Sequence, residues 1–247
     1  MRVLRGTLLP FALVVTLSAQ TPDTLLSDKR LTVHTLLRED VFAGFMSNNM
    51  TRLGRAEQNI EILLKERPDQ RANLIAWRSG AALARAVAAL EGGNTAEFDR
   101  YFKIAQDGFA EAATLSTGND GVAPITGGSF ALFADRLPPS HRAAAWEQAW
   151  TNYSMLWKQQ GPGIDKLPLH FKGEVLAGMA QSAQRTGRNA EATQFLDKMI
   201  ALLADTPYEG MAKKWKADPA SASTTNLTCR NCHAPGRLSA RLAELNK

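Results

Sequence analysis

Apolar residues recur every three or four positions along most of the chain, which is the spacing of one face of an α-helix. The pattern begins near residue 30, where Leu36, Leu37 and Val41 open the first apolar face, and it continues to about residue 216. Turn residues interrupt it at intervals, as in Gly92-Gly93-Asn94 and Gly161-Pro162-Gly163. The sequence therefore predicts an all-α fold of about eight to ten helices.

Small residues recur at a fixed spacing within this pattern. Gly44, Ala56 and Pro68 are separated by twelve residues each time, and Ala180 and Ala192 repeat that interval. Tetratricopeptide helix pairs place a small residue, an alanine and a closing proline at such positions, because small side chains let two helix backbones approach. We therefore expect a tetratricopeptide-like array of helix pairs over residues 30–207. The central helix pairs lack this regular spacing of small residues, so the pattern does not imply a peptide-binding groove.

Two stretches in the middle of the chain are less regular. Residues 116–128 contain four glycines and Pro124, which predicts an irregular connection. After it, Trp146, Trp150, Tyr153 and Trp157 follow one another at helical spacing and form a single aromatic stripe. We expect that stripe to belong to the core, with a ligand-binding wall as the alternative.

The first nineteen residues have the composition of a signal peptide. Arg2 and Arg5 form a basic start, residues 8–17 are apolar, and Leu17-Ser18-Ala19 resembles a cleavage site. The apolar run has about 10 residues against the roughly 20 that span a bilayer. We expect residues 1–19 to be removed, leaving an exported, periplasmic protein without a membrane span; a retained N-terminal anchor is the alternative.

The strongest chemical signal is the run Cys229-Arg230-Asn231-Cys232-His233 near the C-terminus. A C-x-x-C-H run is typical of covalent attachment of a c-type haem, in which each thiol binds one vinyl group and the histidine becomes an axial ligand of the iron. Cys229 and Cys232 are the only cysteines in the chain. A disulfide would not need the histidine, and a zinc site needs about four ligands where this run supplies three. We therefore predict one covalent haem c, with His233 as the proximal ligand.

The C-terminal residues also resemble a known kind of protein. Thr206-Pro207-Tyr208, Lys213-Lys214-Trp215, Asp218-Pro219 and the motif from Cys229 to Gly236 are similar to those of exported bacterial tetratricopeptide-like proteins that end in a C-x-x-C-H haem motif. The resemblance covers about residues 30–247. It implies a helical-repeat c-type cytochrome with a haem segment at 208–247, and it supplies no substrate.

The ligand on the other side of the iron is not specified by the motif. Only fourteen residues follow His233, and none is methionine or histidine. Because methionine and histidine are the usual second ligands in cytochromes c, upstream residues are the candidates. Met211 is the nearest methionine before the motif, and the others are His170, Met179 and Met199. An open or water-ligated iron remains the alternative.

The net charge of +5 is concentrated in the predicted haem segment. Residues 208–247 contain seven Lys or Arg against three acidic residues, whereas the rest of the mature chain is nearly neutral. A basic segment suits an acidic redox partner protein or the haem propionates, and a solvated helix face is the alternative. Export and the absence of interleaved aromatic and basic residues argue against nucleic acid.

Two classes of function follow from these features. The first is an electron-transfer cytochrome, and the second is a tetratricopeptide-like binding or assembly module whose haem senses redox state or a small ligand. An enzyme is less favoured, because no nucleophile constellation, phosphate loop or placed carboxylate pair is present. Glu39, Asp40 and Glu57 are interpreted as solvated or capping carboxylates.

Overall fold

The computed structural model describes residues 26–222, and 84% of these residues are helical. Nine α-helices and no strands are present within that range, which confirms the predicted all-α fold. Their bounds are α1 Val33–Ser47, α2 Met50–Glu66, α3 Arg71–Glu91, α4 Thr95–Leu115, α5 Val122–Phe133, α6 Pro139–Gln160, α7 Leu169–Arg185, α8 Asn189–Leu202 and α9 Pro207–Ala217. Short 3₁₀ turns follow α2, α5, α6 and α9.

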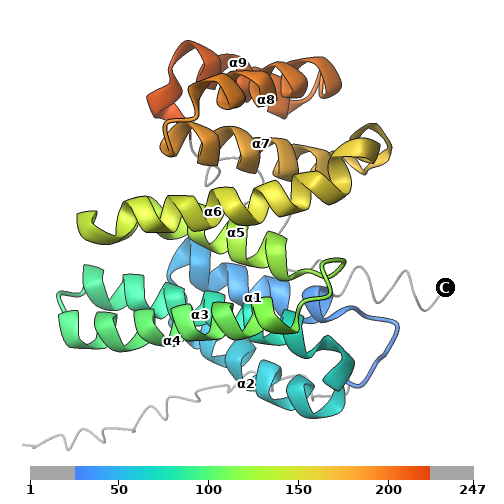
Figure 1. The fold of residues 1–247 in the computed structure, drawn as a ribbon. Coiled ribbons are helices and arrows are strands. Elements are labelled where there is room, and N and C mark those ends of the chain that lie inside the picture. Colours follow the sequence, from blue (N-terminus) through green and yellow to red (C-terminus); the bar gives the residue numbers. More distant parts are fainter. Residues whose placement is uncertain (1–25, 223–247) are drawn as a thin grey trace, which may run out of the picture.

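Successive helices pack in pairs. The pairs are α1 with α2, α3 with α4, α5 with α6 and α7 with α8, and α9 packs against α8. Odd-numbered helices also contact each other, from α1 to α3, from α3 to α5 and from α5 to α7. Figure 1 shows the resulting stack, with α7 to α9 at one end and α1 to α4 at the other. The pairing agrees with a layered helical architecture, and its assignment to the tetratricopeptide class remains a prediction.

The expected close approach within the first pair is present. A Cβ atom added at Gly44 of α1 would lie 2.8 Å from the Leu53 side chain of α2, which is closer than two carbons can pack. Ala56 is fully buried, and so are Leu37 and Val41 of the predicted apolar face. Gly44 thus lets α1 and α2 pack closely, as its spacing from Ala56 predicts.

The predicted irregular connection at 116–128 is wrong for its second half, because α5 begins at Val122. Gly127 and Gly128 therefore lie inside a helix, and they face the buried ring of Tyr153 from α6. Pro124 is tolerated because it occupies the first turn of α5, where its missing N–H has no intrahelical partner. The glycines make room for an aromatic side chain instead of breaking the helix.

The aromatic stripe of α6 belongs to the core, as expected. Trp146 and Tyr153 are 3% exposed, and Trp150 and Trp157 pack against the core from its edge. Trp146 donates a hydrogen bond from Nε1 to Asp135 at 2.9 Å, which satisfies its only polar atom. The stripe is therefore a structural element in this fold.

Asp40 does not have the predicted solvated environment. It is 8% exposed, and it accepts hydrogen bonds from Arg52 at 2.7 Å and from Arg55 at 2.5 Å. Burial alone would raise the pKa of Asp40, but the two guanidinium groups more than offset this and hold the pKa below its ordinary value. Glu57 is likewise paired with Arg85. These carboxylates join helices α1, α2 and α3.

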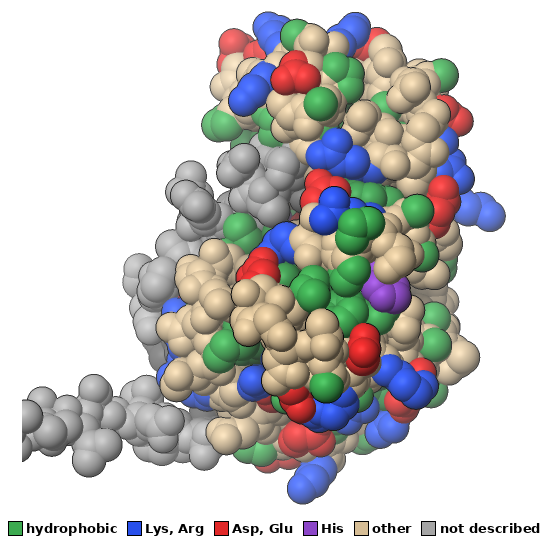
Figure 2. All heavy atoms as spheres, turned by 90° about the vertical axis from the view of Figure 1, so that its left-hand side faces the viewer, with side chains coloured by type: hydrophobic (Ala, Val, Ile, Leu, Met, Phe, Trp, Pro, Cys, Tyr) green, Lys and Arg blue, Asp and Glu red, His purple; other side chains and the backbone are tan. Residues whose placement is uncertain are grey.

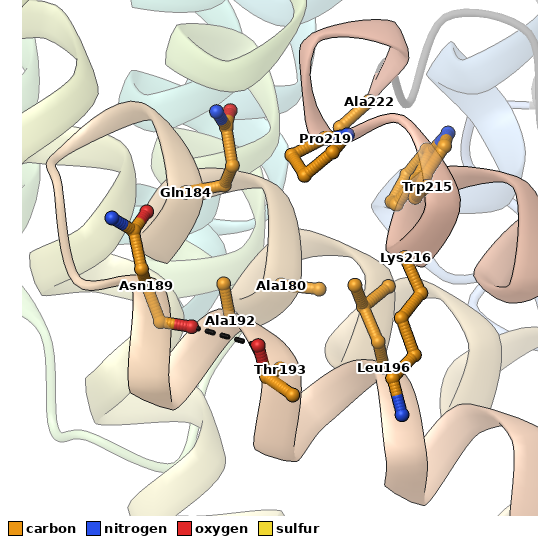
Figure 3. Close-up of a pocket in the computed structure, with 10 residues that line it drawn as sticks. All are labelled: Ala180, Gln184, Asn189, Ala192, Thr193, Leu196, Trp215, Lys216, Pro219 and Ala222. Carbon is orange, nitrogen blue, oxygen red and sulfur yellow. Dashed lines mark hydrogen bonds between the residues drawn. The ribbon is translucent and has the colours of Figure 1, made fainter.

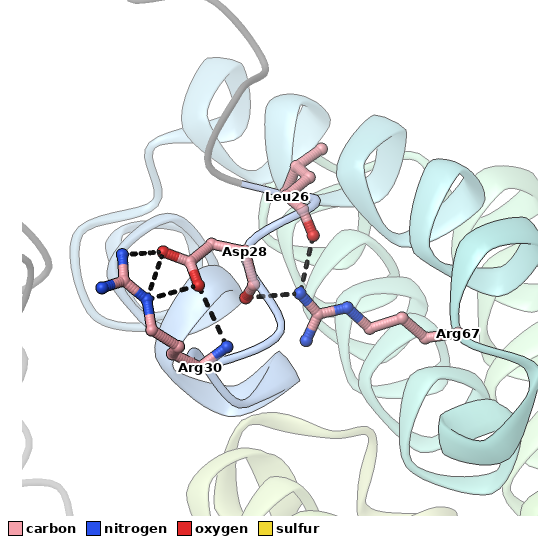
Figure 4. A network of polar contacts seen from close by, with 4 residues as sticks. All are labelled: Leu26, Asp28, Arg30 and Arg67. Carbon is pink, nitrogen blue, oxygen red and sulfur yellow. Dashed lines mark hydrogen bonds and ion pairs between the residues drawn. The ribbon is translucent and has the colours of Figure 1, made fainter. Parts of the chain in front are cut away.

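One buried arginine fixes the segment that leads into α1 (Figure 4). Arg67, which follows α2 and is 8% exposed, donates to the carbonyls of Leu26 at 2.7 Å, Asp28 at 2.8 Å and Leu31 at 2.6 Å. Charged donors to buried carbonyls are among the stronger hydrogen bonds in proteins. Residues 26–31 are thereby held against the end of α2, and this places the start of α1.

Candidate functional site

The predicted haem-attachment residues Cys229, Cys232 and His233 lie outside the described residues. The described chain ends at Ala222, seven residues before Cys229. The structure can therefore place the point from which the haem segment departs and the surfaces that surround that point.

Ala222 is fixed to helix α7. It is 2% exposed, and its carbonyl accepts hydrogen bonds from Arg185 Nη2 at 3.0 Å and from Gln181 Nε2 at 3.4 Å. Gln181 is itself 2% exposed. The last described residue is thus held at a defined position on the C-terminal half of α7.

A cavity of about 100 Å³ lies beside this anchor, between α7, α8 and the segment after α9 (Figure 3). Trp215, Lys216 and Leu196 contribute to its wall. Cofactor and ligand pockets usually measure about 300–1,000 Å³, so this cavity is too small to enclose a haem.

Three methionines were candidates for the second iron ligand. Met179 is 2% exposed and Met199 is fully buried, so both are core residues whose sulfur atoms are enclosed by packing. Met211 lies on α9 and is partly buried against the same core. Of the three, Met211 is therefore the one that keeps an accessible side chain. Its role as the second iron ligand remains a prediction.

Histidines begin two of the helices. His34 is in the first turn of α1 and His170 is in the first turn of α7, and the charge of His170 is one of the causes that lower the pKa of His34. The His34 ring packs against Trp77 of α3, with 5.5 Å between ring centroids. Phe42, two turns along α1 from His34, meets the same indole edge-on at 6.1 Å. We refer to His34, Arg38, Phe42 and Trp77 as the histidine surface.

The histidine surface contains two polar atoms that lack partners. Trp77 is 4% exposed, and neither its Nε1 nor the buried Nε of Arg38 has a hydrogen-bond acceptor among residues 26–222. Arg38 also forms no ion pair within that range. Buried donors usually find acceptors, because an unsatisfied one costs about 1–3 kcal/mol. Both atoms are enclosed by the packing of α1 against α3, so the fold itself bears this cost.

The charge state of His34 suits metal coordination. Burial lowers the pKa of His34 to about 4, and the positive charges of Arg38 and His170 lower it further. The His34 residue keeps contact with solvent, and desolvation, Arg38 and His170 all shift its pKa in the same direction. At neutral pH the imidazole is uncharged, which is the form that binds a metal ion.

Comparison with protein-family models, with curated proteins and with solved structures gives no match. The functional interpretation of this chain accordingly rests on its own residues. Within residues 26–222, no group of three or more His, Cys, Asp or Glu side chains is arranged to hold a metal ion, and no helix has the length and apolarity of a membrane span.

A carboxylate faces His170 on α7. Glu174 Oε2 lies 3.5 Å from His170 Nε2, one turn along α7. Desolvation raises the pKa of Glu174 to about 7. A shift of that size corresponds to about 3 kcal/mol for a fully enclosed group. The Glu174 side chain is still 34% exposed, so solvent screening reduces the cost of its charge to roughly 1–2 kcal/mol.

Glu174→Gln should therefore stabilise the protein above neutral pH. The folded state keeps a proton on Glu174 that the unfolded chain releases above its ordinary pKa, so stability falls as the pH rises from about 4.5 to about 7. The variant removes that decline. Its free energy of unfolding should exceed that of wild type by roughly 1–2 kcal/mol at pH 8 and should equal it at pH 4. Urea unfolding across this range measures the difference. Glu61→Gln, at an exposed carboxylate, is the control, and an equal pH dependence in both variants would contradict this account.

Sequence reasoning named His170 but missed His34, Arg38 and Trp77 as parts of one surface. His34 and Arg38 share a face of α1 because they are four residues apart, and this is the only local signal. Trp77 comes from α3, and its contact with α1 depends on the packing of the two helices, which spacing along the chain does not reveal.

Proposed function

We propose that this chain is an exported c-type cytochrome with one covalent haem, which transfers electrons through that haem on a helical scaffold. The observation that carries the proposal is the C-x-x-C-H run from Cys229 to His233. The predicted signal peptide at 1–19 supports it, because covalent haem c is assembled outside the bacterial cytoplasm. The resemblance to exported tetratricopeptide-like haem proteins supports the same proposal.

The attachment chemistry needs no oxidant. Each thiol adds across one vinyl double bond, so that sulfur bonds to the inner carbon and the thiol hydrogen moves to the terminal carbon. Cys229 and Cys232 each contribute one thioether in this way, and His233 supplies the proximal imidazole. When bound, the haem supplies a one-electron redox couple whose potential depends on its axial ligands and burial.

The body of the protein has the features of a rigid support. Ala222 is held to α7 by Gln181 and Arg185, so the haem segment starts from a fixed point. A rigid support benefits electron transfer, because small structural changes on oxidation and reduction keep the reorganisation of the site small. Two lysines of the basic segment form ion pairs at 2.6 Å: Lys213 with Glu209 of the same helix, and Lys216 with Asp197 of α8.

An acidic redox partner remains our proposal for the interaction of the basic segment. Figure 2 shows one face of the molecule, on which acidic and basic side chains are mixed and hydrophobic side chains lie between them. That face has no area of a single charge sign, so the attraction of an acidic partner is assigned to the C-terminal residues. The rate of electron transfer to such a partner should fall as the salt concentration rises.

The alternative is a protein-binding or assembly module in which the haem senses redox state or a small ligand. The pairing of helices in the described residues is the observation that favours it, because stacked helix pairs often present binding surfaces. A sensor needs an open iron position for its ligand, whereas an electron carrier has both axial positions filled.

A redox titration combined with carbon monoxide exposure separates these functions. The protein, produced with haem-maturation machinery, should be reduced and reoxidised reversibly in a single one-electron step. Its reduced spectrum should remain unchanged under carbon monoxide at neutral pH. Rapid formation of a carbon monoxide adduct would favour the sensor, and an irreversible or absent redox step would contradict electron transfer.

A further inference from the structure

The cavity between α7, α8 and the segment after α9 has an apolar floor (Figure 3). Four buried side chains form this floor, each at most 6% exposed: Ala180, Ala192, Leu196 and Trp215. The two alanines end in methyl groups, so α7 and α8 leave between them a space of about 100 Å³. An unfilled apolar space lacks the packing contacts that a side chain would make there.

The rim of the cavity is polar, and its groups have partners within the fold. Asn189, Thr193 and Lys216 line the mouth and are exposed to solvent. Thr193 Oγ1 donates a hydrogen bond to the carbonyl of Asn189 at 3.0 Å, and Lys216 pairs with Asp197 at 2.6 Å. A polar ligand would have to compete with these interactions. An apolar side chain would fill the floor and leave the rim as it is.

The chain itself brings an apolar side chain close to this mouth. Ala222, the last described residue, forms part of the cavity wall. Residues 223–228 follow, and Leu227 is the one large apolar residue among them, since the others are serine, threonine and asparagine. Leu227 is five residues beyond Ala222, and an extended chain covers at most about 3.3–3.6 Å per residue, which gives a reach of up to about 18 Å. The cavity therefore lies within reach of Leu227.

The residues that precede the described chain start from a different place. The described chain begins at Leu26, and Arg67 holds the carbonyl of Leu26 beside the end of α2. Helices α1 to α4 form one end of the stack, and α7 to α9 form the other (Figure 1). The N-terminal segment is thus a poorer occupant for a cavity between α7 and α8 than the segment that leaves from its wall.

The leucines beyond the haem motif are also poorer occupants. Leu238, Leu242 and Leu245 lie at least sixteen residues beyond Ala222, against five for Leu227. The entropy lost on closing a loop increases with loop length, so the shortest loop that places a leucine in the cavity is favoured.

We propose that Leu227 inserts into this cavity and so fixes the start of the haem motif on the body of the protein. The docking itself needs no haem, but its consequence for the haem rests on the proposed function. With Ala222 and Leu227 both held, residues 223–226 become a short loop between two fixed points. Cys229 follows two residues later and is kept near α8 and α9. Leu227 is a positioning residue, which determines where the haem is carried.

Thermal unfolding of Leu227 variants tests the insertion. Leu227→Ser should lower the melting temperature of the haem-carrying protein by about 2–4 °C, because a buried aliphatic side chain is lost and the entropy of ordering its segment is regained. Leu227→Met, which keeps the volume and the apolar character, should behave like wild type. Thr225→Ala, in the same segment, is the matched control and should leave the melting temperature unchanged.

A variant that blocks the cavity shows whether the effect of Leu227 arises there. Thr193→Phe places a ring at the mouth from an exposed position of α8. In this background Leu227→Ser should cause no further decrease in melting temperature. An equal decrease in both backgrounds, or no decrease in either, would overturn the proposal. A decrease that depends on the cavity in Leu242→Ser but not in Leu227→Ser would overturn it in favour of the last residues.

Disulfide trapping tests the proximity directly, in the full chain with both motif cysteines replaced by serine. Thr193→Cys/Thr228→Cys puts one thiol on the rim and the other beside Leu227. Under oxidised glutathione this pair should form a disulfide at least about tenfold faster than Gln106→Cys/Thr228→Cys, whose first thiol lies on α4, because docking raises the effective concentration of the thiols. Adding Leu227→Ser should remove the difference. Equal rates in the two pairs would contradict the docking.

The trapping experiment separates this inference from the proposed function, because the trapped chain carries no covalent haem. If the thiols are trapped but wild type carries no haem, Leu227 docks and the cytochrome assignment is wrong. If wild type carries one haem but the thiols are not trapped, the docking is wrong and the cytochrome assignment stands.

Discussion

Gly178→Ala is expected to lower the free energy of unfolding by roughly 2 kcal/mol, although alanine is the better helix former. A Cβ atom at position 178 of α7 would lie 2.1 Å from the Tyr153 ring of α6, which is itself 3% exposed. Overpacking of this kind costs typically 1–3 kcal/mol and occasionally more, whereas replacing glycine by alanine in a helix gains about 1 kcal/mol. The net loss corresponds to a decrease of roughly 4–8 °C in melting temperature.

Gly210→Ala makes the same chemical change but is expected to stabilise the protein. Gly210 lies inside α9, and no atom outside its immediate helix neighbourhood lies within 4 Å of an added Cβ. The free energy of unfolding of this variant should rise by roughly 0.5–1 kcal/mol, because only helix propensity changes. Thermal and urea unfolding of the two variants measure the contrast. Equal effects at both positions would show that Gly178 does not determine the packing of α7 on α6.

The replacement of both motif cysteines, Cys229→Ser/Cys232→Ser, is expected to abolish covalent haem completely. The single variants Cys229→Ser and Cys232→Ser each retain one thiol, so a fraction of each should still carry haem through one thioether. Intact mass under denaturing conditions distinguishes the three variants from wild type.

Circular dichroism is the control for folding in these variants. The buried core described for residues 26–222 contains neither cysteine, so the helical signal of the double variant should match that of wild type. A wild-type protein without haem and with a Cys229–Cys232 disulfide would instead support the redox-disulfide alternative.

Local features of the sequence were sufficient to predict the first helices and their buried faces. The apolar face that contains Leu37 and Val41 follows the helical period, and both residues are buried in α1. Gly44 and Ala56 were expected to allow close packing, and a Cβ at Gly44 would indeed meet Leu53 at 2.8 Å. Such features depend on residues near each other in the chain, which is why spacing alone reveals them.

The misassigned stretch at 116–128 has a non-local cause. Its glycines indicate a loop by composition, but a Cβ atom added at Gly127 would lie 3.3 Å from the Tyr153 ring, and one added at Gly128 would lie 3.6 Å from the Tyr153 hydroxyl. The glycines serve the packing of a ring that is some 25 residues away in the sequence. Asp40 was misread for a related reason, because its arginine partners come from the next helix.

The candidate site also has one part that local sequence predicts and one part that depends on packing. Cys229, Cys232 and His233 form a contiguous motif, so the sequence alone supports the haem prediction. The contact between His34 of α1 and Trp77 of α3 joins residues 43 positions apart, and it depends on the packing of the two helices. Such contacts could not be inferred from the neighbourhood of the motif.

Acid-acetone extraction of the denatured wild-type protein tests the central claim most directly. The account predicts that the haem absorption stays with the polypeptide, and that the intact mass exceeds the mass of the mature chain by one haem. Thioether bonds to Cys229 and Cys232 survive this treatment, whereas coordination by His233 alone does not. Transfer of all the haem into the organic phase, leaving a polypeptide of unmodified mass, would contradict the account.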